Sequence, residues 1–384
     1  MKEASRLETK QGVRFVYLNE TTPYETGLLH GRLLRDEIQV FIDQLESFAG
    51  SYISPKMIGK GMLKLLRTFA WTLLRTFPAT QQQELKGISD GCKQDISWII
   101  FANTIHDVLA VKLLRNRVTT GCSAAITTTQ KEGLLMTKLT DLYVTPELSN
   151  ILASHRFVFV HQGKWLSQPF LTTAFTGCLA GDIVVRKNGL AFTVNDGGTM
   201  DKKLVFRNRA LLSITRTLAE EAVTTDAIID GLKKNRTMKS YTFLVTDGSK
   251  QGSLIVDTCN GDIGITKLDT SLFNVNRFHS QELIDNHFIE NYQNDQLFKN
   301  SEKRFQVMTK NVSKMTDAEN AIKVIQIHGP KFCAATEGSL SNTGTVQAIV
   351  YETKNRVLHI TAGGKVPVSV FGKWVTFEIE KLFD

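Results

Sequence analysis

The order of two sequence patterns, helical first and strand-forming afterwards, most constrains the fold of this chain. After a short opening hairpin, residues up to 118 carry apolar side chains at helical spacing, as in the stretch 26–50, which ends at a glycine. From Cys122 onward the sequence changes to short runs of β-branched and aromatic residues separated by turn residues. Further helices are expected at about 207–233, 280–290 and 300–310. This order predicts an α+β protein with large sheets covered by helices, and not a βαβ succession.

Charge and motifs exclude several classes of function. The chain has 384 residues, enough to bury a full core, and a net charge of +8. Its Lys and Arg residues are spread out, so we expect no nucleic-acid partner. The sequence has neither a GxGxxG motif nor a P-loop, which argues against nucleotide binding. We therefore expect neither a cofactor nor a metal.

The five cysteines are distant from one another and include no C-x-x-C pair, which argues against a disulfide framework and a zinc site. The start of the sequence has no apolar stretch typical of a secretory signal. Both observations favour the cytoplasm or another reducing compartment, with one special thiol. The cysteines are Cys92, Cys122, Cys178, Cys259 and Cys333.

The most lipophilic stretch is residues 57–77. Four basic residues interrupt it, so it is too charged to span a bilayer and is expected to form an amphipathic helix. A core-facing helix is the favoured interpretation, and contact with a membrane surface or an acyl chain stays the alternative. The basic residues are Lys60, Lys64, Arg67 and Arg75.

The pair Gly121-Cys122 stands at the start of an apolar, strand-like run. A thiol there can act as a nucleophile if the chain is cut just before it, because the new α-amino group, with a pKa of about 8, can serve as its base. The glycine gives steric freedom for the bend that an N-to-S acyl shift needs. The alternative is structural, since free cysteine is commonly a core residue.

The residues after Cys122 indicate what lies beside it. The turn "TQKEG", residues 129–133, is expected to return the chain as an antiparallel strand. Positions 137–141 then lie next to the cysteine, and Lys138 and Asp141 become candidates for lining the end of the sheet where the thiol lies.

Several fragments, taken in their order, resemble one known family: the acyl-coenzyme A:6-aminopenicillanic acid acyltransferases, which are N-terminal nucleophile (Ntn) hydrolases related to the choloylglycine hydrolases. "GCSAAI" resembles the cleavage site of that family, G-C-T-[ST]-A. The resemblance covers nearly the whole chain. The other fragments are "PYETGLLHGRLLRDEI", "ELKGISDGCKQDISWIIFANTIHDVL", "KNGLAFTVND", "NVNRFHS" and "NSEKRFQVM".

The resemblance implies a role for each matching residue. Cys122 would be both the residue after the cut and the nucleophile, with its own amine as base, and Asp141 would hold that amine. Asn195, with backbone N–H groups and Asn276, would stabilise the tetrahedral oxyanion. Arg304 would position the site or a substrate carboxylate; Ser301 belongs to the same fragment.

Two departures from the family pattern bear on the substrate. Lys138, the other expected substrate contact, stands where relatives often carry Arg or Gln, and Arg277 replaces the histidine of the usual Asn-His pair, which moves the histidine to position 279. His30 and His106 lie on apolar helical faces and are expected to be core histidines.

The resemblance implies the αββα four-layer sandwich of antiparallel sheets, in which a helical segment, residues 1–121, and a catalytic portion, residues 122–384, form one structural unit. The expected function is an autoprocessing amidase or acyltransferase that cleaves a linear, non-peptide amide of a small N-acyl substrate through a Cys122 thioester, with the cut chain staying together as a heterodimer. A lipid amidase or phospholipase-like acyl hydrolase is the first alternative. An uncleaved binding or effector module without enzymatic activity is the second.

Overall fold

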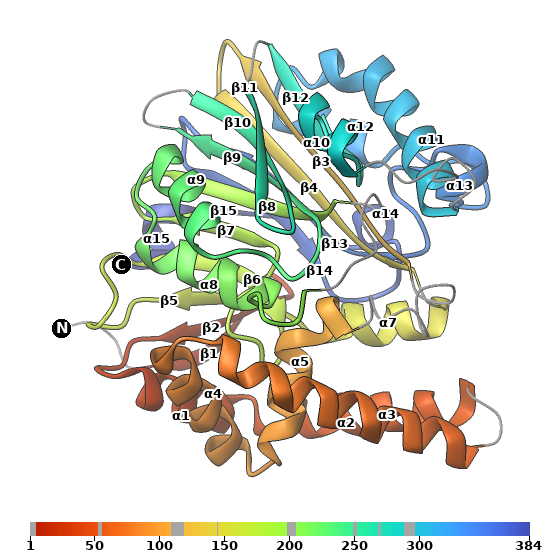
Figure 1. The fold of residues 1–384 in the computed structure, drawn as a ribbon. Coiled ribbons are helices and arrows are strands. Elements are labelled where there is room, and N and C mark those ends of the chain that lie inside the picture. Colours follow the sequence, from red (N-terminus) through yellow and green to blue (C-terminus); the bar gives the residue numbers. More distant parts are fainter. Residues whose placement is uncertain are drawn as a thin grey trace.

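Two β-sheets stacked face to face, with helices on both outer faces, form the body of the protein (Figure 1). We describe a computed structural model, which covers residues 5–52, 56–108, 119–143, 145–197, 205–248, 252–267, 270–287 and 296–384. Helices and sheets form separate layers, so the expected α+β class and the αββα order of an Ntn hydrolase are confirmed.

The larger sheet has nine strands in the order β1-β2-β5-β6-β7-β8-β9-β10-β11. Its neighbouring strands are antiparallel except β2 and β5, which run parallel, so the expectation of a purely antiparallel sheet was wrong at this pair. The strands are β1 (Arg6–Lys10), β2 (Val13–Leu18), β5 (Arg156–His161), β6 (Phe170–Phe175), β7 (Ile183–Arg186), β8 (Leu190–Asp196), β9 (Tyr241–Asp247), β10 (Gly252–Cys259) and β11 (Asp262–Lys267).

The smaller sheet has six strands in the order β12-β3-β4-β13-β14-β15, all antiparallel. Its long hairpin of β3 and β4 forms around the predicted turn, and its register pairs Cys122 with Thr140 and Gly121 with Asp141. The strands are β3 (Thr119–Thr129), β4 (Gly133–Tyr143), β12 (Ser271–Asn274), β13 (Thr345–Glu352), β14 (Val357–Ala362) and β15 (Val375–Glu378).

Helices from the first part of the chain, together with α8 and α9, cover the larger sheet, while α11 and α12 cover the smaller one (Figure 1). A third apolar core fills the space between the sheets. The helices are α1 (Pro23–Leu33), α2 (Arg35–Tyr52), α3 (Lys56–Leu73), α4 (Ala79–Cys92), α5 (Ile96–Val108), α7 (Pro146–Ser154), α8 (Leu211–Glu221), α9 (Thr225–Lys234), α10 (Gln281–His287), α11 (Gln296–Asn311), α12 (Ala318–Ile325), α13 (Ala334–Glu337), α14 (Val368–Phe371) and α15 (Ile379–Phe383).

Some helices differ from the sequence-based expectation. The stretch 26–50 forms two helices, α1 and α2, because the chain leaves helical geometry at Leu34. The stretch 57–77 forms α3 and a short 3-10 turn. None of the helices within the described ranges has both the length and the apolar character required to cross a bilayer.

Helices α1 and α4 pack at unusually short range through glycines. A Cβ placed on Gly27 would lie 2.0 Å from the backbone oxygen of Glu84, and one on Gly31 would lie 2.2 Å from that of Ile88. Gly87 faces α1 in the same way, with Tyr24 O at 2.2 Å from its ideal Cβ. Only glycine fits at such a contact, which explains the glycines in the two fragments around these helices.

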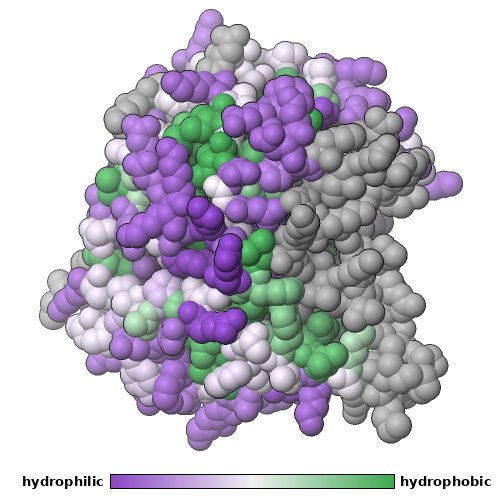
Figure 2. All heavy atoms as spheres, viewed as in Figure 1, coloured by the Kyte–Doolittle hydropathy of each residue, from purple (hydrophilic) through white to green (hydrophobic). Residues whose placement is uncertain are grey.

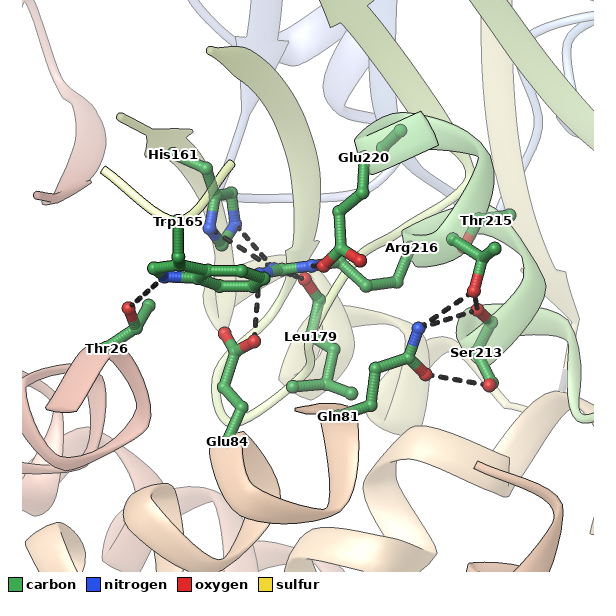
Figure 3. A network of polar contacts seen from close by, with 12 residues as sticks. Thr26, Gln81, Glu84, His161, Trp165, Leu179, Ser213, Thr215, Arg216 and Glu220 are labelled. Atoms are coloured by element: carbon green, nitrogen blue, oxygen red, sulfur yellow. Dashed lines mark hydrogen bonds and ion pairs between the residues drawn. The ribbon is translucent and has the colours of Figure 1, made fainter. Parts of the chain in front are cut away.

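Glu84, whose backbone lies at the close contact between α1 and α4, belongs to a buried charged network (Figure 3). Arg216 of α8, wholly buried, donates to Glu84 Oε2 over 2.8 Å and also pairs with Glu220. Its Nη1 donates to the backbone oxygen of Leu179 over 2.8 Å and lies 3.2 Å from His161 Nδ1. Burial raises the pKa of Glu84 to about 7, although Arg216 opposes the shift.

The N-terminal segment is joined to the rest of the fold through sheet pairing. Its strands β1 and β2 occupy one edge of the larger sheet, and β2 pairs with β5. The residues before Cys122 at the start of β3 also pair with β4, for example Thr119 with Tyr143.

Candidate active site

Cys122 lies in β3 with its side chain turned toward the larger sheet. Alternate residues of a strand face opposite sides, and Ala124, two residues on, belongs to the core between the sheets, whereas Ala125 belongs to the core beneath α11 and α12. The cross-strand neighbour Thr140 therefore shares the face of Cys122. The cysteine is 7% exposed.

The backbone of Cys122 is held from the other side of the strand. Its N–H donates to Oδ1 of Asn276 over 2.8 Å, and its C=O accepts from Nη1 of Arg304 over 2.5 Å. Asn276 has a left-handed backbone, with φ of 69°, and its Nδ2 donates to the backbone oxygen of Asp196 over 3.0 Å. The sheet ladder and these side chains together fix the amide nitrogen that a cut before Cys122 would turn into an amine.

Arg304 of α11 is wholly buried, and each of its guanidinium nitrogens has a partner in the protein. Nε donates to Asn300 Oδ1 over 2.6 Å, and Nη2 donates to Asn276 Oδ1 over 2.7 Å. Nη1 also donates to Ser123 Oγ over 2.9 Å. The predicted residue thus lies at Cys122, where it binds protein groups and not an open pocket.

Ser301, from the same fragment, donates to the backbone oxygen of Val275. The first turns of α11 therefore clamp the loop that carries Asn276.

Asp141 is wholly buried on the face of β4 opposite the thiol. Its Oδ1 accepts from Thr345 Oγ1 over 2.7 Å, and its Oδ2 accepts from Asn342 Nδ2 over 3.0 Å. Burial raises the pKa of Asp141, and Arg304, with Nη1 4.0 Å from Oδ2, opposes the shift. The hairpin brings Asp141 beside the backbone of Gly121, while the thiol points away from it.

Lys138 lies on the thiol face and is wholly buried. Its Nζ donates to the backbone oxygen of Val194 over 2.5 Å and to Oδ1 of Asn195. Asn195 in turn donates from Nδ2 to the backbone oxygen and to Oδ1 of Asn274, over 3.1 and 3.0 Å. Asn195 therefore links the lysine to the loop that carries Asn276.

Asp182 is a further carboxylate on the thiol side of β3, and sequence reasoning missed it. Asp182, just before β7, accepts from Thr140 Oγ1 over 2.5 Å and lies 3.6 Å from Lys138 Nζ. Burial opposes ionisation of Asp182, but Arg156 and Lys138 hold its pKa below the usual value. Asp182 follows an ordinary "LAG" turn in the sequence, and no motif or spacing connects it with Cys122.

The surroundings of the thiol favour its neutral form. Burial raises the pKa of Cys122; the Lys138 cation opposes this shift, whereas the carboxylates of Asp182 and Asp141 add to it. A nucleophile in this position needs a base close by.

The structure also describes the backbone before Cys122 and the two histidines expected in the core. Gly121 belongs to β3, and the pairing of β3 with β4 continues through it, so the bend that an N-to-S acyl shift needs would have to form from this paired strand. His30 is wholly buried, and burial lowers its pKa to about 3; burial lowers that of His106 to about 4. Across the described residues, no group of three His, Cys, Asp or Glu side chains could hold a metal ion.

An apolar cleft lies near the far end of this polar cluster. Phe175, at the end of β6, is one of its walls, and the Arg156 guanidinium stacks on that ring with Cζ 4.1 Å from the centroid. Other residues that line the cleft include Ile38, Phe41, Trp98, Phe101 and Ile105. Arg156 therefore separates the polar groups around Cys122 from apolar side chains of α2 and α5.

Comparison with known proteins yields one family. The model of the family described as acyl-coenzyme A:6-aminopenicillanic acid acyl-transferase matches residues 128–366, which begin six positions after Cys122. No curated protein matches the chain. Among solved structures, a Caenorhabditis elegans N-acylethanolamine-hydrolyzing acid amidase ortholog is 12% identical, with a TM-score of 0.44, over 61% of this chain and 93% of that one. On the family match, which spans more than half of the sequence, the chain belongs to the acyl-coenzyme A:6-aminopenicillanic acid acyl-transferase family.

Proposed function

We propose that this protein is an autoprocessing Ntn amidase or acyltransferase that uses Cys122 to cleave a linear, non-peptide amide. The observation that carries the proposal is that two different groups of side chains surround Cys122. Asn276 and Arg304 hold its backbone on one side of β3, and Lys138 and Asp182 lie on the side of its thiol.

The first reaction would be the cut itself. Cys122 Sγ attacks the carbonyl carbon of Gly121, and the thiol proton passes to the peptide nitrogen. The C–N bond then breaks, and a thioester joins Gly121 to the Cys122 sulfur. Water then hydrolyses that thioester, which frees the Gly121 carboxylate, the thiol and the α-amino group of Cys122.

In turnover the free amine would take the thiol proton while Sγ attacks the substrate carbonyl. The amine portion of the substrate leaves with that proton, and the acyl group stays on Sγ until water or another amine accepts it. Lys138 would stabilise negative charge on the sulfur. Asn195 Nδ2 makes two hydrogen bonds to Asn274 and would have to give up one of them to serve the oxyanion. Asn276 Nδ2 donates one of its two hydrogens to Asp196 and would offer the other.

Intact-mass analysis of purified protein tests this proposal. We expect two fragments separated at Gly121–Cys122, and a single uncut, inactive chain for Cys122→Ala. An active preparation that stays one chain, or an active Cys122→Ala variant, would refute it. A folded protein whose Cys122 does not react with iodoacetamide would favour an uncleaved binding or effector module.

A specific observation favours lipid amides among the substrates. On α3, Leu65 is 63% exposed and Trp71 is 47% exposed, and the same helix carries the exposed, basic Lys64. Figure 2 shows hydrophobic side chains among hydrophilic ones on the part of this face formed by the N-terminal helices. Apolar and basic side chains together suit the surface of an anionic membrane.

Vesicle sedimentation tests this second candidate. We expect the protein to bind vesicles that contain anionic lipid and to lose most of that binding in a Leu65→Ser/Trp71→Ser variant. Equal sedimentation of both proteins, or activity on small water-soluble amides alone, would exclude it.

A further inference from the structure

The loop that joins β6 to β7, residues 176–182, ends at Asp182 on the thiol side of β3. The side chain of Asn103, in α5, binds this β6–β7 loop at two points. Its Nδ2 donates to the backbone oxygen of Gly177 over 2.9 Å, and its Oδ1 accepts the backbone N–H of Leu179 over 2.8 Å. A single, wholly buried amide therefore holds a carbonyl and an N–H of the same loop.

Two further side chains hold the β6–β7 loop. Arg216 of α8 donates from Nη1 to the backbone oxygen of Leu179 over 2.8 Å. On the side of the sheet, Thr172 Oγ1 of β6 accepts the backbone N–H of Gly181 over 3.0 Å. A Cβ on Gly181 would lie 1.7 Å from the backbone oxygen of Thr173, so the loop runs directly against β6. The loop is thus anchored to two helices and to its own strand, immediately before Asp182.

The anchored loop determines where the Asp182 carboxylate lies. Oδ2 lies 3.6 Å from Lys138 Nζ, and Oδ1 lies 3.4 Å from Arg156 Nη1, while His106 of α5 is also nearby. Lys138 is the cation next to the thiol of Cys122, and it lowers the pKa of that thiol, whereas Asp182 raises it. A carboxylate held in this position therefore offsets part of the charge that Lys138 offers to the sulfur.

We propose that Asn103 is a positioning residue for the reaction at Cys122: by holding the β6–β7 loop it keeps the Asp182 carboxylate beside Lys138, and so sets how strongly that cation acts on the sulfur. The inference rests on the proposed function in taking Cys122 as the nucleophile. The thiolate is the reactive form of a cysteine, and a cation beside it favours that form. Asp182 competes with the thiolate for Lys138 from the place that the loop gives it.

The pH profile of Cys122 alkylation by iodoacetamide tests the proposal. Its midpoint follows the pKa of the thiol, whereas the rate at high pH follows the exposure of the sulfur. In Asn103→Leu the loop loses both contacts, and Asp182 is no longer held beside Lys138. We expect the midpoint to fall by at least about 0.5 pH unit, which raises the thiolate fraction below the midpoint about threefold. Asp182→Asn should lower the midpoint by at least as much.

A double variant distinguishes positioning from a general loss of stability. If Asn103 acts through the carboxylate, Asn103→Leu should shift the midpoint of an Asp182→Asn protein by less than about 0.2 pH unit. An undiminished shift in the double variant would overturn the proposal.

Thr104→Val is the matched control. Thr104 is the next residue of α5 and is also wholly buried, but its hydroxyl donates within the helix, to the backbone oxygen of Ile100 over 2.9 Å. This variant should keep the wild-type midpoint. Equal shifts in Thr104→Val and Asn103→Leu would show that any weakening of α5 has the same effect, and would overturn the proposal.

Thr172→Val is a second, milder test, for which the loop is loosened from the side of the sheet. It keeps the shape of the side chain but leaves the Gly181 N–H without its acceptor, so the midpoint should fall in the same direction. Where Asn103→Leu does not fold, an unchanged midpoint in Thr172→Val overturns the proposal.

Alkylation is measured by mass spectrometry, which separates the cut and the uncut protein. Trypsin cleaves after Arg117, so an uncut chain and a chain that begins at Cys122 give different peptides. Midpoints are compared between variants within one of these forms, because the free α-amino group of the cut form adds its own effect on the thiol.

This inference and the proposed function can fail separately, because alkylation needs neither a substrate nor a cut. A shift that depends on Asp182, in a protein that neither cuts itself nor cleaves any amide, would sustain the role of Asn103 and refute the proposed function. An active, self-cut protein whose midpoint is the same in the wild type and in Asn103→Leu would refute the inference and leave the proposed function standing.

Discussion

Oδ1 of Asn276 accepts the backbone N–H of Cys122 over 2.8 Å, and it does so from a residue in the left-handed conformation. The same oxygen accepts from Arg304 Nη2 over 2.7 Å. Oδ1 of Asn276 therefore links the backbone nitrogen of Cys122 to Arg304 of α11.

Replacing Asn276 separates the function of its amide from that of its backbone. Asn276→Gly keeps the left-handed backbone without strain and removes the acceptor, which leaves the buried Cys122 N–H unpaired at a cost of about 1–3 kcal/mol. Asn276→Ala should lose roughly 1 kcal/mol more, because alanine adopts this conformation poorly. Both variants should cut at least tenfold more slowly, as measured by denaturing gel over time. Equal unfolding free energies for the two variants would contradict the argument from the backbone.

Lys138 is predicted to control the acidity of the thiol. In Lys138→Met the cation that lowers the pKa of Cys122 is gone while burial and Asp182 remain, so the pKa rises further. Alkylation by iodoacetamide at pH 8 should then be about tenfold slower for each unit by which the pKa rises. Lys138→Arg keeps the charge and serves as the control. A Met variant that reacts as fast as the Arg variant at every pH would show that the cation has no such role.

The glycine contact between α1 and α4 should be intolerant of a single methyl group. Gly27→Ala places a Cβ 2.0 Å from Glu84 O, so the helices must separate, and we expect at least about 2 kcal/mol of lost stability. Gly61→Ala is the matched control, because no atom lies within 4 Å of its ideal Cβ in the middle of α3. That variant should be about 0.5–1 kcal/mol more stable. Urea unfolding of both variants measures the difference, and equal midpoints would count against the contact.

Glu84 should make stability depend on pH. Its pKa is about 7 in the folded protein against 4.5 as the ordinary value, so the folded state holds the proton more tightly than the unfolded chain. Its contribution to stability is therefore full below pH 4.5 and is lost as the pH rises through 7. Between pH 4.5 and 7, the Tm of Glu84→Gln should rise relative to that of the wild-type protein. Buried histidines such as His30 and His106, whose lowered pKa values make stability rise with pH, contribute equally to both proteins. Asp107 and Asp257, whose pKa values burial raises to about 6, contribute equally to both proteins; identical slopes would refute the role of Glu84.

The part of the site that lies close in sequence could be predicted. The turn between β3 and β4 is local, so it placed positions 137–141 beside Cys122, and the structure has that pairing. The contacts of Asn276 and Arg304 with Cys122 cross more than 150 positions, and only the resemblance to a family drew attention to them.

Asp182 and Arg156 could not be predicted in the same way. Each stands in a run whose pattern fits an ordinary strand or turn. Only the stacking of the two sheets brings these side chains to the face of β3 and β4 that carries the thiol. The helix α12 was missed although its signal was present: Asp317 caps it through the backbone N–H of Asn320, and apolar residues follow at helical spacing.

The place of β2 between β1 and β5 has a consequence for the cut protein. The residues before Cys122 supply the outermost two strands of the larger sheet, so their departure would turn β5 from an interior strand into a bare, aggregation-prone edge. The same residues begin β3 and remain paired with β4. Hydrolysis of one peptide bond would therefore leave the size and shape of the particle unchanged, and the two polypeptides would elute together until a denaturant separates them.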